Sequence, residues 1–300
     1  MIVYEATKTE FIKDVESGFI DQKIQSLMMA KLGRHVSLNE VRSWSNSLGQ
    51  MHMVLYSDDV PSNCGVAIEY KIPNTGKRVD LIVSGRDKDS KYRAIIIELK
   101  QWSDVKKVDS QDAIVQTFLN GRLVNTTHPS YQAWSYASLI YDYNESIRDE
   151  KVEIFPCAYL HNYGRSEKDD PLFDGAYTFY LDKAPAFVKG DAIKLREFIS
   201  RYIKFGDNKE VLYYIEHGKI KPSKSLQDSV RNMIAGNQEF LMIDEQKVVY
   251  ERAKELALRC FEGGRKRVYI VKGGPGTGKS VLAINLLSEL LNMEKNVLYV

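Results

Sequence analysis

The sequence predicts an α/β protein, in which a mixed β-sheet flanked by helices precedes a second α/β segment. β-Branched apolar runs at 65–70, 78–83 and 93–100 are typical of strands. Stretches with helical spacing of apolar residues lie before and after them. Near the C-terminal end a strand, a glycine-rich loop, a helix and a further strand follow one another. That order indicates α/β architecture at this end too.

The composition is that of a globular protein long enough for two domains. Of the 300 residues, 44% are hydrophobic and 27% are charged. The formal net charge is only +2, so bulk charge neither favours nor excludes a nucleic-acid partner. A basic groove, if one exists, must be local.

The cysteines and the apolar runs indicate the compartment. Cys64, Cys157 and Cys260 are far apart and form no CxxC pair, which argues against a disulfide framework or a zinc knuckle. The chain begins MIVYEATKTEF, where Glu and Lys come too early for a signal peptide. No apolar run approaches the roughly 18–20 residues that cross a bilayer. We therefore expect a cytoplasmic protein that has no membrane partner.

The first domain is expected to alternate helices with strands. A helix is predicted over 9–32 and a second from Ser37 to about Gly49. The polar loop between the strands 78–83 and 93–100 predicts an antiparallel pair. The remaining predicted elements are a helix from Pro129 to 143, strands over 152–160 and 176–181, and a helix over 191–204.

Helical patterns dominate from Pro222 onward. The elements expected there are helices over 223–236, 244–263 and 280–293, and strands over 268–272 and 296–300. These patterns predict a first domain over 1–210, a helical connector over 211–242 and the N-terminal part of a second domain over 243–300. The core of an α/β domain such as this second one needs several parallel strands that helices cover on both faces. We therefore expect poor order or non-native packing beyond about residue 265.

A phosphate-binding motif begins the last helix. Residues 273–280, GGPGTGKS, match G-x-x-x-x-G-K-[ST] in full. Backbone N–H groups of such a loop turn onto phosphate oxygens, and the helix start adds its positive dipole end. Lys279 is expected to reach the β- and γ-phosphates, and the Ser280 hydroxyl to bind Mg²⁺. The residues assigned to nucleotide binding are Gly273, Gly274, Pro275, Gly276, Thr277, Gly278, Lys279 and Ser280.

A second group of polar residues lies in the predicted sheet. Asp80 interrupts RVDLIV, and Glu98 and Lys100 share one face at the end of AIIIELK. A hairpin would place Asp80 beside Glu98. Mg²⁺ prefers a few carboxylate oxygens, and Lys100 could orient a metal-acidified water and stabilise charge on a phosphate. The alternative is a strand that becomes polar where it meets solvent, but an unpaired charge after three isoleucines would be costly.

Flanking residues extend this group. Gln132 and Tyr136 are four residues apart on the next helix, so their side chains project from one face. That face either belongs to the site or is an ordinary helix surface. Glu40 lies on the preceding helix, either as a further metal ligand or in a capping box with Ser37. His128 could approach the metal site, although its place before Pro129 is that of a helix-entry residue.

Together, Asp80, Glu98 and Lys100 resemble the core of the PD-(D/E)XK nuclease superfamily. Gln132 and Tyr136 resemble the QxxxY element of its RecB-like branch, although Val79 stands where the superfamily has a proline. The resemblance implies that Asp80, Glu98, Lys100, Gln132 and Tyr136 are catalytic residues. It also implies that Asp80 and Glu98, with Glu40 as a further candidate, bind Mg²⁺ or Mn²⁺.

The segment from Pro222 onward resembles the start of the Schlafen-like group of superfamily I DNA/RNA helicases. Gln246 matches the glutamine that this superfamily places before the P-loop to read adenine, which implies ATP. The two resemblances imply a hydrolase, a nuclease fused to an ATP-driven helicase whose further motifs follow residue 300 and whose partner is DNA or RNA. They imply no oligomeric state. The alternatives are an inactive nuclease-like module that grips nucleic acid for an ATPase, or a regulatory NTPase switch.

Overall fold

The computed structural model describes all residues of the chain except 74, 120, 224–240, 264, 275–276 and 299–300. The chain divides into two compact units. Unit 1 comprises Met1–Asp104, Pro129–Asp170 and Phe179–Pro222, and unit 2 comprises Val105–His128, Pro171–Thr178 and Ser223–Val300. Among the described residues, no helix is long and apolar enough to cross a membrane.

Unit 1 is built on a six-stranded mixed sheet with the order β1-β2-β3-β4-β8-β9. β1 to β4 are antiparallel neighbours, whereas β8 pairs in parallel with both β4 and β9. The strands are β1 (Ile2–Thr7), β2 (Gly65–Lys71), β3 (Arg78–Arg86), β4 (Tyr92–Lys100), β8 (Glu153–Leu160) and β9 (Ala186–Val188). The predicted mixed sheet and the predicted β3–β4 hairpin are therefore confirmed.

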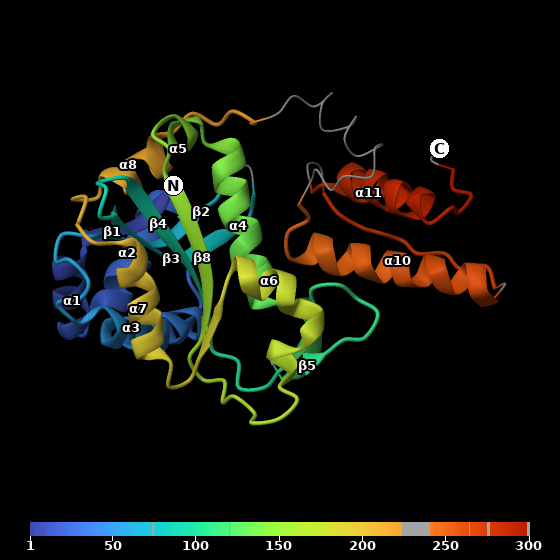
Figure 1. The fold of residues 1–300 in the computed structure, drawn as a ribbon, viewed down its shortest axis with the longest axis horizontal. Helices are drawn as coiled ribbons and strands as arrows, with labels where there is room; N and C mark the ends of the chain where they lie inside the picture. Colours follow the sequence, from blue (N-terminus) through green and yellow to red (C-terminus); the bar gives the residue numbers. More distant parts are fainter. Residues whose placement is uncertain (74, 120, 224–240, 264, 275–276, 299–300) are drawn as a thin grey trace. The chain divides into compact units, whose positions relative to one another are not determined.

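Helices cover both faces of this sheet (Figure 1). One face is packed by α1 (Lys8–Glu16), α2 (Ile20–Leu32), α3 (Leu38–Leu55) and α7 (Ala192–Tyr202). On the other face, α4 (Pro129–Tyr143) packs against β4 and β8. The remaining helices of the unit are α5 (Glu145–Asp149), α6 (Thr178–Lys183) and α8 (Glu210–His217).

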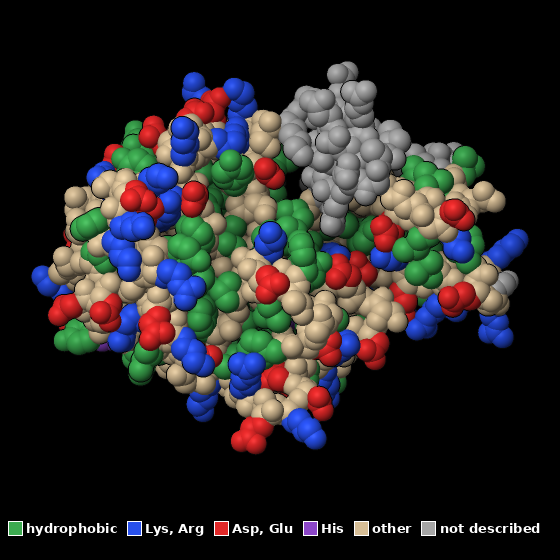
Figure 2. All heavy atoms as spheres, viewed as in Figure 1, with side chains coloured by type: hydrophobic (Ala, Val, Ile, Leu, Met, Phe, Trp, Pro, Cys, Tyr) green, Lys and Arg blue, Asp and Glu red, His purple; other side chains and the backbone are tan. Residues whose placement is uncertain are grey.

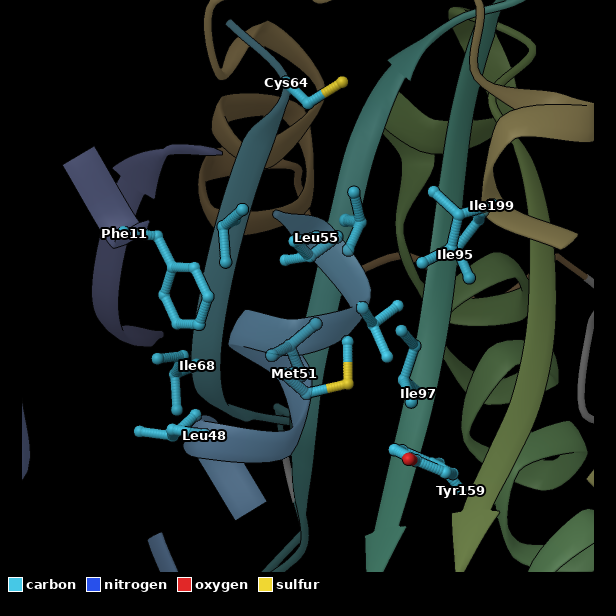
Figure 3. Packing of buried hydrophobic residues seen from close by; sticks show 14 of the residues in the cluster. Phe11, Leu48, Met51, Leu55, Cys64, Ile68, Ile95, Ile97, Tyr159 and Ile199 are labelled. Atoms are coloured by element: carbon cyan, nitrogen blue, oxygen red, sulfur yellow. The ribbon is translucent and has the colours of Figure 1, made fainter. Parts of the chain in front are cut away.

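The main core of unit 1 lies between the sheet and α3 (Figure 3). Ile95 and Ile97 of β4 point toward Met51 and Leu55 of α3, and all four side chains are fully buried. Because side chains alternate along a strand, the residues between these isoleucines face α4 instead. Glu98 therefore belongs to the α4 face.

Two predicted elements have a different structure from the one expected. The helix expected over 9–32 is two helices, because Gly18 takes a left-handed φ of 74° between them. The strand expected over 176–181 is wrong. Those residues form the 3₁₀ helix η2 (Gly175–Tyr177) and α6, and the Asp174 side chain accepts a hydrogen bond from the Ala176 N–H at the start of η2.

Unit 2 contains a small antiparallel sheet and two long helices. Its elements are β5 (Lys106–Lys107), β6 (Ile114–Leu119), β7 (Arg122–Thr127), the 3₁₀ helix η1 (Pro171–Phe173), α10 (Glu245–Gly263) and α11 (Lys279–Asn292). Met242, Tyr250 of α10 and Leu282 of α11 form a common apolar cluster. The helices predicted over 244–263 and 280–293 are confirmed, whereas nearly all of the one predicted over 223–236 lies outside the described residues.

The predicted strands on either side of α11 do not form in the described residues 265–274 and 296–298. Val268, Ile270 and Leu298 are 88%, 71% and 85% exposed. A strand of a parallel sheet is stabilised by ladder partners and by helices on both faces. The described part of the chain places neither beside these segments.

Candidate functional site

Asp80 and Glu98 meet on adjacent strands of unit 1. Leu81 of β3 pairs with Ile97 of β4, so Asp80 and Glu98 face each other one residue beyond that pair. The Glu98 carboxyl lies close enough to that of Asp80 to shift its pKa, and Asp80 Oδ2 accepts a hydrogen bond of 2.8 Å from the Leu99 N–H. Glu98 is 2% exposed. Two carboxyl groups in such contact must share a proton or a cation, because two bare negative charges would repel.

Electrostatics at this pair oppose its full ionisation. Burial raises the pKa of the Asp80 carboxyl above its ordinary value, while the ammonium group of Lys100, the Leu99 N–H and the Glu98 side chain act in the opposite direction. Desolvation disfavours the charged form of any buried acid. The pair is therefore a place where a cation can replace a shared proton.

Lys100 completes the group at the C-terminal end of β4. Its Nζ donates to Glu98 Oε1 over 2.6 Å and lies 5.5 Å from the centre of the Trp102 ring. The next residue, Gln101, donates from Nε2 to Ser43 Oγ at 2.9 Å and to Ser47 Oγ at 3.2 Å. These bonds attach the strand end to α3 and restrict the position of Lys100.

The donor set fits Mg²⁺ better than a metal that needs an all-protein cage. Within the described part of the chain, no three His, Cys, Asp or Glu side chains are arranged to hold a metal ion. Mg²⁺ typically binds through one or two carboxylates and completes its shell with waters and substrate phosphates. The contacting carboxyl groups of Asp80 and Glu98 supply that number of ligands.

Gln132 and Tyr136 lie together on α4. Gln132 Nε2 donates to the Tyr136 hydroxyl oxygen over 3.0 Å, and Tyr136 is 1% exposed. α4 packs against β4 and β8, on the face of the sheet to which Glu98 belongs. The structure thus pairs these two residues with each other, on the helix that packs against β4 and β8.

Glu40 binds two arginines. Its two carboxylate oxygens accept bonds of 3.0 Å from the Arg34 guanidinium, and Oε1 also accepts from Arg78 Nη2 at 3.0 Å. The backbone N–H of Glu40 donates to Ser37 Oγ at 3.3 Å, which is the backbone half of the expected capping box. The carboxylate is engaged by guanidinium groups.

Glu69 is a buried acid beside this site that the sequence analysis did not single out. It is 5% exposed, and its Oε1 accepts a bond of 2.7 Å from Trp44 Nε1. Its other oxygen forms an ion pair with Arg78. Burial, reinforced by the negative charge of Asp80, raises the pKa of Glu69 to about 7. The available signal was a carboxylate inside the apolar strand GVAIEYK, as at Glu98.

The backbone at Glu69 is strained. Its φ is 58°, a left-handed value that costs a non-glycine residue on the order of 1–3 kcal/mol. β2 pairs with β3 through Ile68↔Leu81 and Tyr70↔Val79, and the ladder skips Glu69 between these pairs. Strain of this kind persists only where the surrounding contacts hold it. Here those contacts are the bonds to Trp44 and Arg78.

His128 is fully buried in unit 2. Its Nε2 is 2.9 Å from the Leu172 carbonyl oxygen, and its ring lies 4.6 Å from the ring of Tyr177. These contacts are those expected of a packed helix-entry residue. Burial lowers the pKa of His128 to about 4.

That depressed pKa predicts acid sensitivity. The unfolded chain binds a proton at this histidine near pH 6.5 and the folded chain only near 4, so stability falls as the pH drops through that window. Between pH 6.5 and 5 the loss should be about 2 kcal/mol. Urea unfolding at both pH values measures it, and His128→Gln should flatten the dependence. An unchanged slope in the variant would contradict the assignment.

The glycine-rich loop of unit 2 contacts the predicted adenine-reading glutamine. Gln246 Nε2 donates to the Thr277 carbonyl over 3.0 Å. Gly278, at the start of α11, has a φ of 81°, and a Cβ there would lie 2.4 Å from Gln246 Nε2. Glycine suits this position, because a side chain would be strained by the left-handed backbone and would displace the Gln246 amide.

Lys279 and Ser280 occupy the first turn of α11 and are exposed. Lys279 Nζ donates to the carbonyl oxygens of Gly273 and Gly274 at 2.9 and 2.7 Å. Pro275 and Gly276 lie outside the described residues. The ammonium group therefore already points at the loop where phosphates would bind.

Comparison with known proteins gives one match. Residues 266–300 match the family model of the Schlafen group 3 DNA/RNA helicase domain. No curated protein and no solved structure matches the chain. The matched stretch contains the glycine-rich loop and α11. This C-terminal stretch of the chain is therefore similar to a Schlafen-type DNA/RNA helicase domain.

Proposed function

We propose that the chain belongs to a nuclease–helicase, in which unit 1 cleaves phosphodiester bonds with Mg²⁺ or Mn²⁺ and unit 2 contributes to an ATP-driven domain. One observation carries the nuclease part. Glu98 is buried and Asp80 half-buried, their carboxyl groups interact, and the Lys100 ammonium lies 2.6 Å from Glu98 Oε1. A structural role alone gives no reason to bring two acids together inside an apolar sheet.

The chemistry follows from what these side chains can do. Bound Mg²⁺ would supply an acidified water and a positive charge beside the scissile phosphate. Asp80 and Glu98 would hold the ion through their carboxylate oxygens. Lys100 stays within reach of the same point, where its ammonium orients the attacking water and stabilises the charge that develops on phosphate oxygens.

The nucleic-acid substrate, DNA or RNA, is supported by the helicase-type match at residues 266–300. Figure 2 shows Lys and Arg side chains mixed with Asp and Glu over the visible face of unit 1. On that visible face the two signs of charge are interspersed, so it offers no extended basic surface. In unit 2, Gln246, Lys279 and Ser280 are the proposed contacts to adenine, phosphate and Mg²⁺.

The test replaces Lys100 by methionine, which keeps the length of the side chain but removes its charge. Cleavage of fluorescent single-stranded DNA and RNA oligonucleotides in Mg²⁺ should fall on the order of 100-fold or more. Binding, measured by anisotropy in Ca²⁺, should change less than about threefold, because a single phosphate contact contributes little to affinity. Lys194→Met is the matched control, since Lys194 is exposed and pairs with Asp191 on the surface.

Other outcomes distinguish the alternatives. A wild-type chain that binds oligonucleotides but cleaves none in Mg²⁺ or Mn²⁺ would be a nucleic-acid-gripping module and would overturn the proposed nuclease. Cleavage that survives in Lys100→Met would also overturn it. ATP hydrolysis that no nucleic acid stimulates, measured in a protein with the complete helicase domain, would indicate a regulatory switch.

A further inference from the structure

A continuous chain of polar contacts connects α3 to the strands that carry the candidate site. Trp44 Nε1 donates to Glu69 Oε1 over 2.7 Å, and the other oxygen of Glu69 pairs with Arg78. Arg78 Nη2 then donates to Glu40 Oε1 over 3.0 Å. Trp44 and Glu40 belong to α3, Glu69 to β2 and Arg78 to β3. Three consecutive elements of the chain are thus joined through one guanidinium group.

This guanidinium lies where it can control the position of Asp80. Arg78 precedes Asp80 by two residues on β3, so the two side chains project from the same face of the strand. Glu69 stands opposite Asp80 on the neighbouring strand, between the pairs Ile68↔Leu81 and Tyr70↔Val79. Any shift of Arg78 therefore moves the strand segment that presents Asp80 to Glu98.

The geometry of this link requires arginine. Arg78 uses Nε for Glu69 and Nη2 for Glu40, so one planar group bridges two carboxylates at once. A lysine would bring the same charge as a single point and would not reproduce that fork. The Glu69 side chain is 7% exposed and that of Arg78 25% exposed, so solvent screens the pair only in part.

We propose that Arg78 and Glu69 are positioning residues of the candidate metal site, which hold Asp80 in contact with Glu98 without binding the metal themselves. The left-handed backbone at Glu69 aims its carboxylate at Trp44 and Arg78, and Arg78 fixes the end of β3. This inference rests on the proposed function, because it concerns the same carboxylates. It adds two residues whose role is to place a metal ligand.

For Arg78→Gln, the loss of positive charge and the loss of positioning predict opposite changes in the affinity for a divalent cation. Removing a positive charge near two carboxylates should by itself tighten the binding of a divalent cation. If Arg78 positions Asp80, the same variant should bind Mn²⁺ about tenfold more weakly, as when the supporting partner of a ligand is lost. Arg78→Lys, which keeps the charge but not the fork, should be equally weak. The Glu69→Gln variant should also bind Mn²⁺ more weakly than the wild type.

The probe is Mn²⁺ alone, titrated into the whole chain and followed by electron paramagnetic resonance. Arg86→Gln is the matched control, because Arg86 lies at the other end of β3 and forms a similar ion pair with Glu210 at 2.6 Å. Its Mn²⁺ affinity should stay within twofold of the wild type. Circular dichroism and the Tm of each variant show whether it is folded at the temperature of the titration.

The double variant Glu69→Gln/Arg78→Gln covers the case in which one unpaired buried charge unfolds a single variant. It removes both charges, so it should fold better than either single variant and still bind Mn²⁺ about tenfold more weakly. Tighter or unchanged Mn²⁺ binding in Arg78→Gln or in the double variant would overturn the positioning role, as would recovery in Arg78→Lys. Absence of Mn²⁺ binding in the wild type would instead overturn the proposed function.

Discussion

Replacing Asp80 by asparagine should abolish metal-dependent cleavage and at the same time make unit 1 more stable. The asparagine keeps the volume of Asp80, and its Oδ1 can still accept the bond from the Leu99 N–H, which is 2.8 Å from Asp80 Oδ2. Its amide can donate to Glu98, so the clash of two acids disappears. Cleavage should fall on the order of 10³-fold, because a neutral amide is a poor ligand for Mg²⁺.

The gain in stability should be on the order of 1 kcal/mol at neutral pH, as is common when a functional site loses a strained charge. Burial raises the pKa of Asp80, so its ionised form is the unfavourable one in the folded chain. Oligonucleotide cleavage and urea unfolding measure the two effects. A variant that is less stable than the wild type, or one that retains cleavage, would contradict the interpretation of the pair.

Asp87→Asn is the matched control for this result. Asp87 follows the same strand, but its carboxylate makes favourable contacts with its neighbours. It forms an ion pair with Arg93 Nη2 at 2.5 Å and accepts hydrogen bonds from the N–H groups of Asp89 and Lys91. Its replacement should therefore destabilise unit 1 and leave cleavage unchanged. Opposite signs of stability change for two aspartates of one hairpin would separate a functional carboxylate from a structural one.

Replacing Lys279 by alanine should weaken ATP binding by about 100-fold or more in a protein that carries the complete helicase domain, because its charge-assisted contact to the terminal phosphates is lost. In the present structure its Nζ binds the carbonyl oxygens of Gly273 and Gly274 at 2.9 and 2.7 Å. A nucleotide would replace these contacts with phosphate oxygens. Titration with a fluorescent ATP analogue measures the loss.

The same variant tests whether the two activities are chemically independent. The residues proposed for cleavage need no nucleotide, so Lys279→Ala should cut a short oligonucleotide at the wild-type rate. Cleavage of a long duplex should decrease if the ATP-driven domain delivers substrate. Lys295→Ala removes a positive charge just beyond the same helix and serves as the control. Equal loss on the short and the long substrate would show that the division of labour is wrong.

Local spacing was sufficient for much of the fold. The strands at 65–71, 78–86 and 92–100 follow from β-branched apolar runs, and the hairpin from the polar loop between two of them. The same runs made Asp80 and Glu98 conspicuous, because a carboxylate in an apolar strand needs a reason to be there. Spacing failed at 176–181, where the aromatic residues that resemble a strand belong to short helices. There the tertiary context outweighed β-propensity.

The sequence pattern therefore reveals which chemical groups are present: two acids and a lysine in the sheet, and a glycine-rich loop ahead of a helix. Their exact mutual placement depends on the register of the strand pairs, on packing against α3 and on backbone angles that composition does not reveal. Nothing local to Glu69 predicts its φ of 58°, and nothing local to Arg78 predicts that it bridges Glu69 and Glu40. Such contacts form only after β2, β3 and α3 have packed, because folding alone brings their charges within bonding distance.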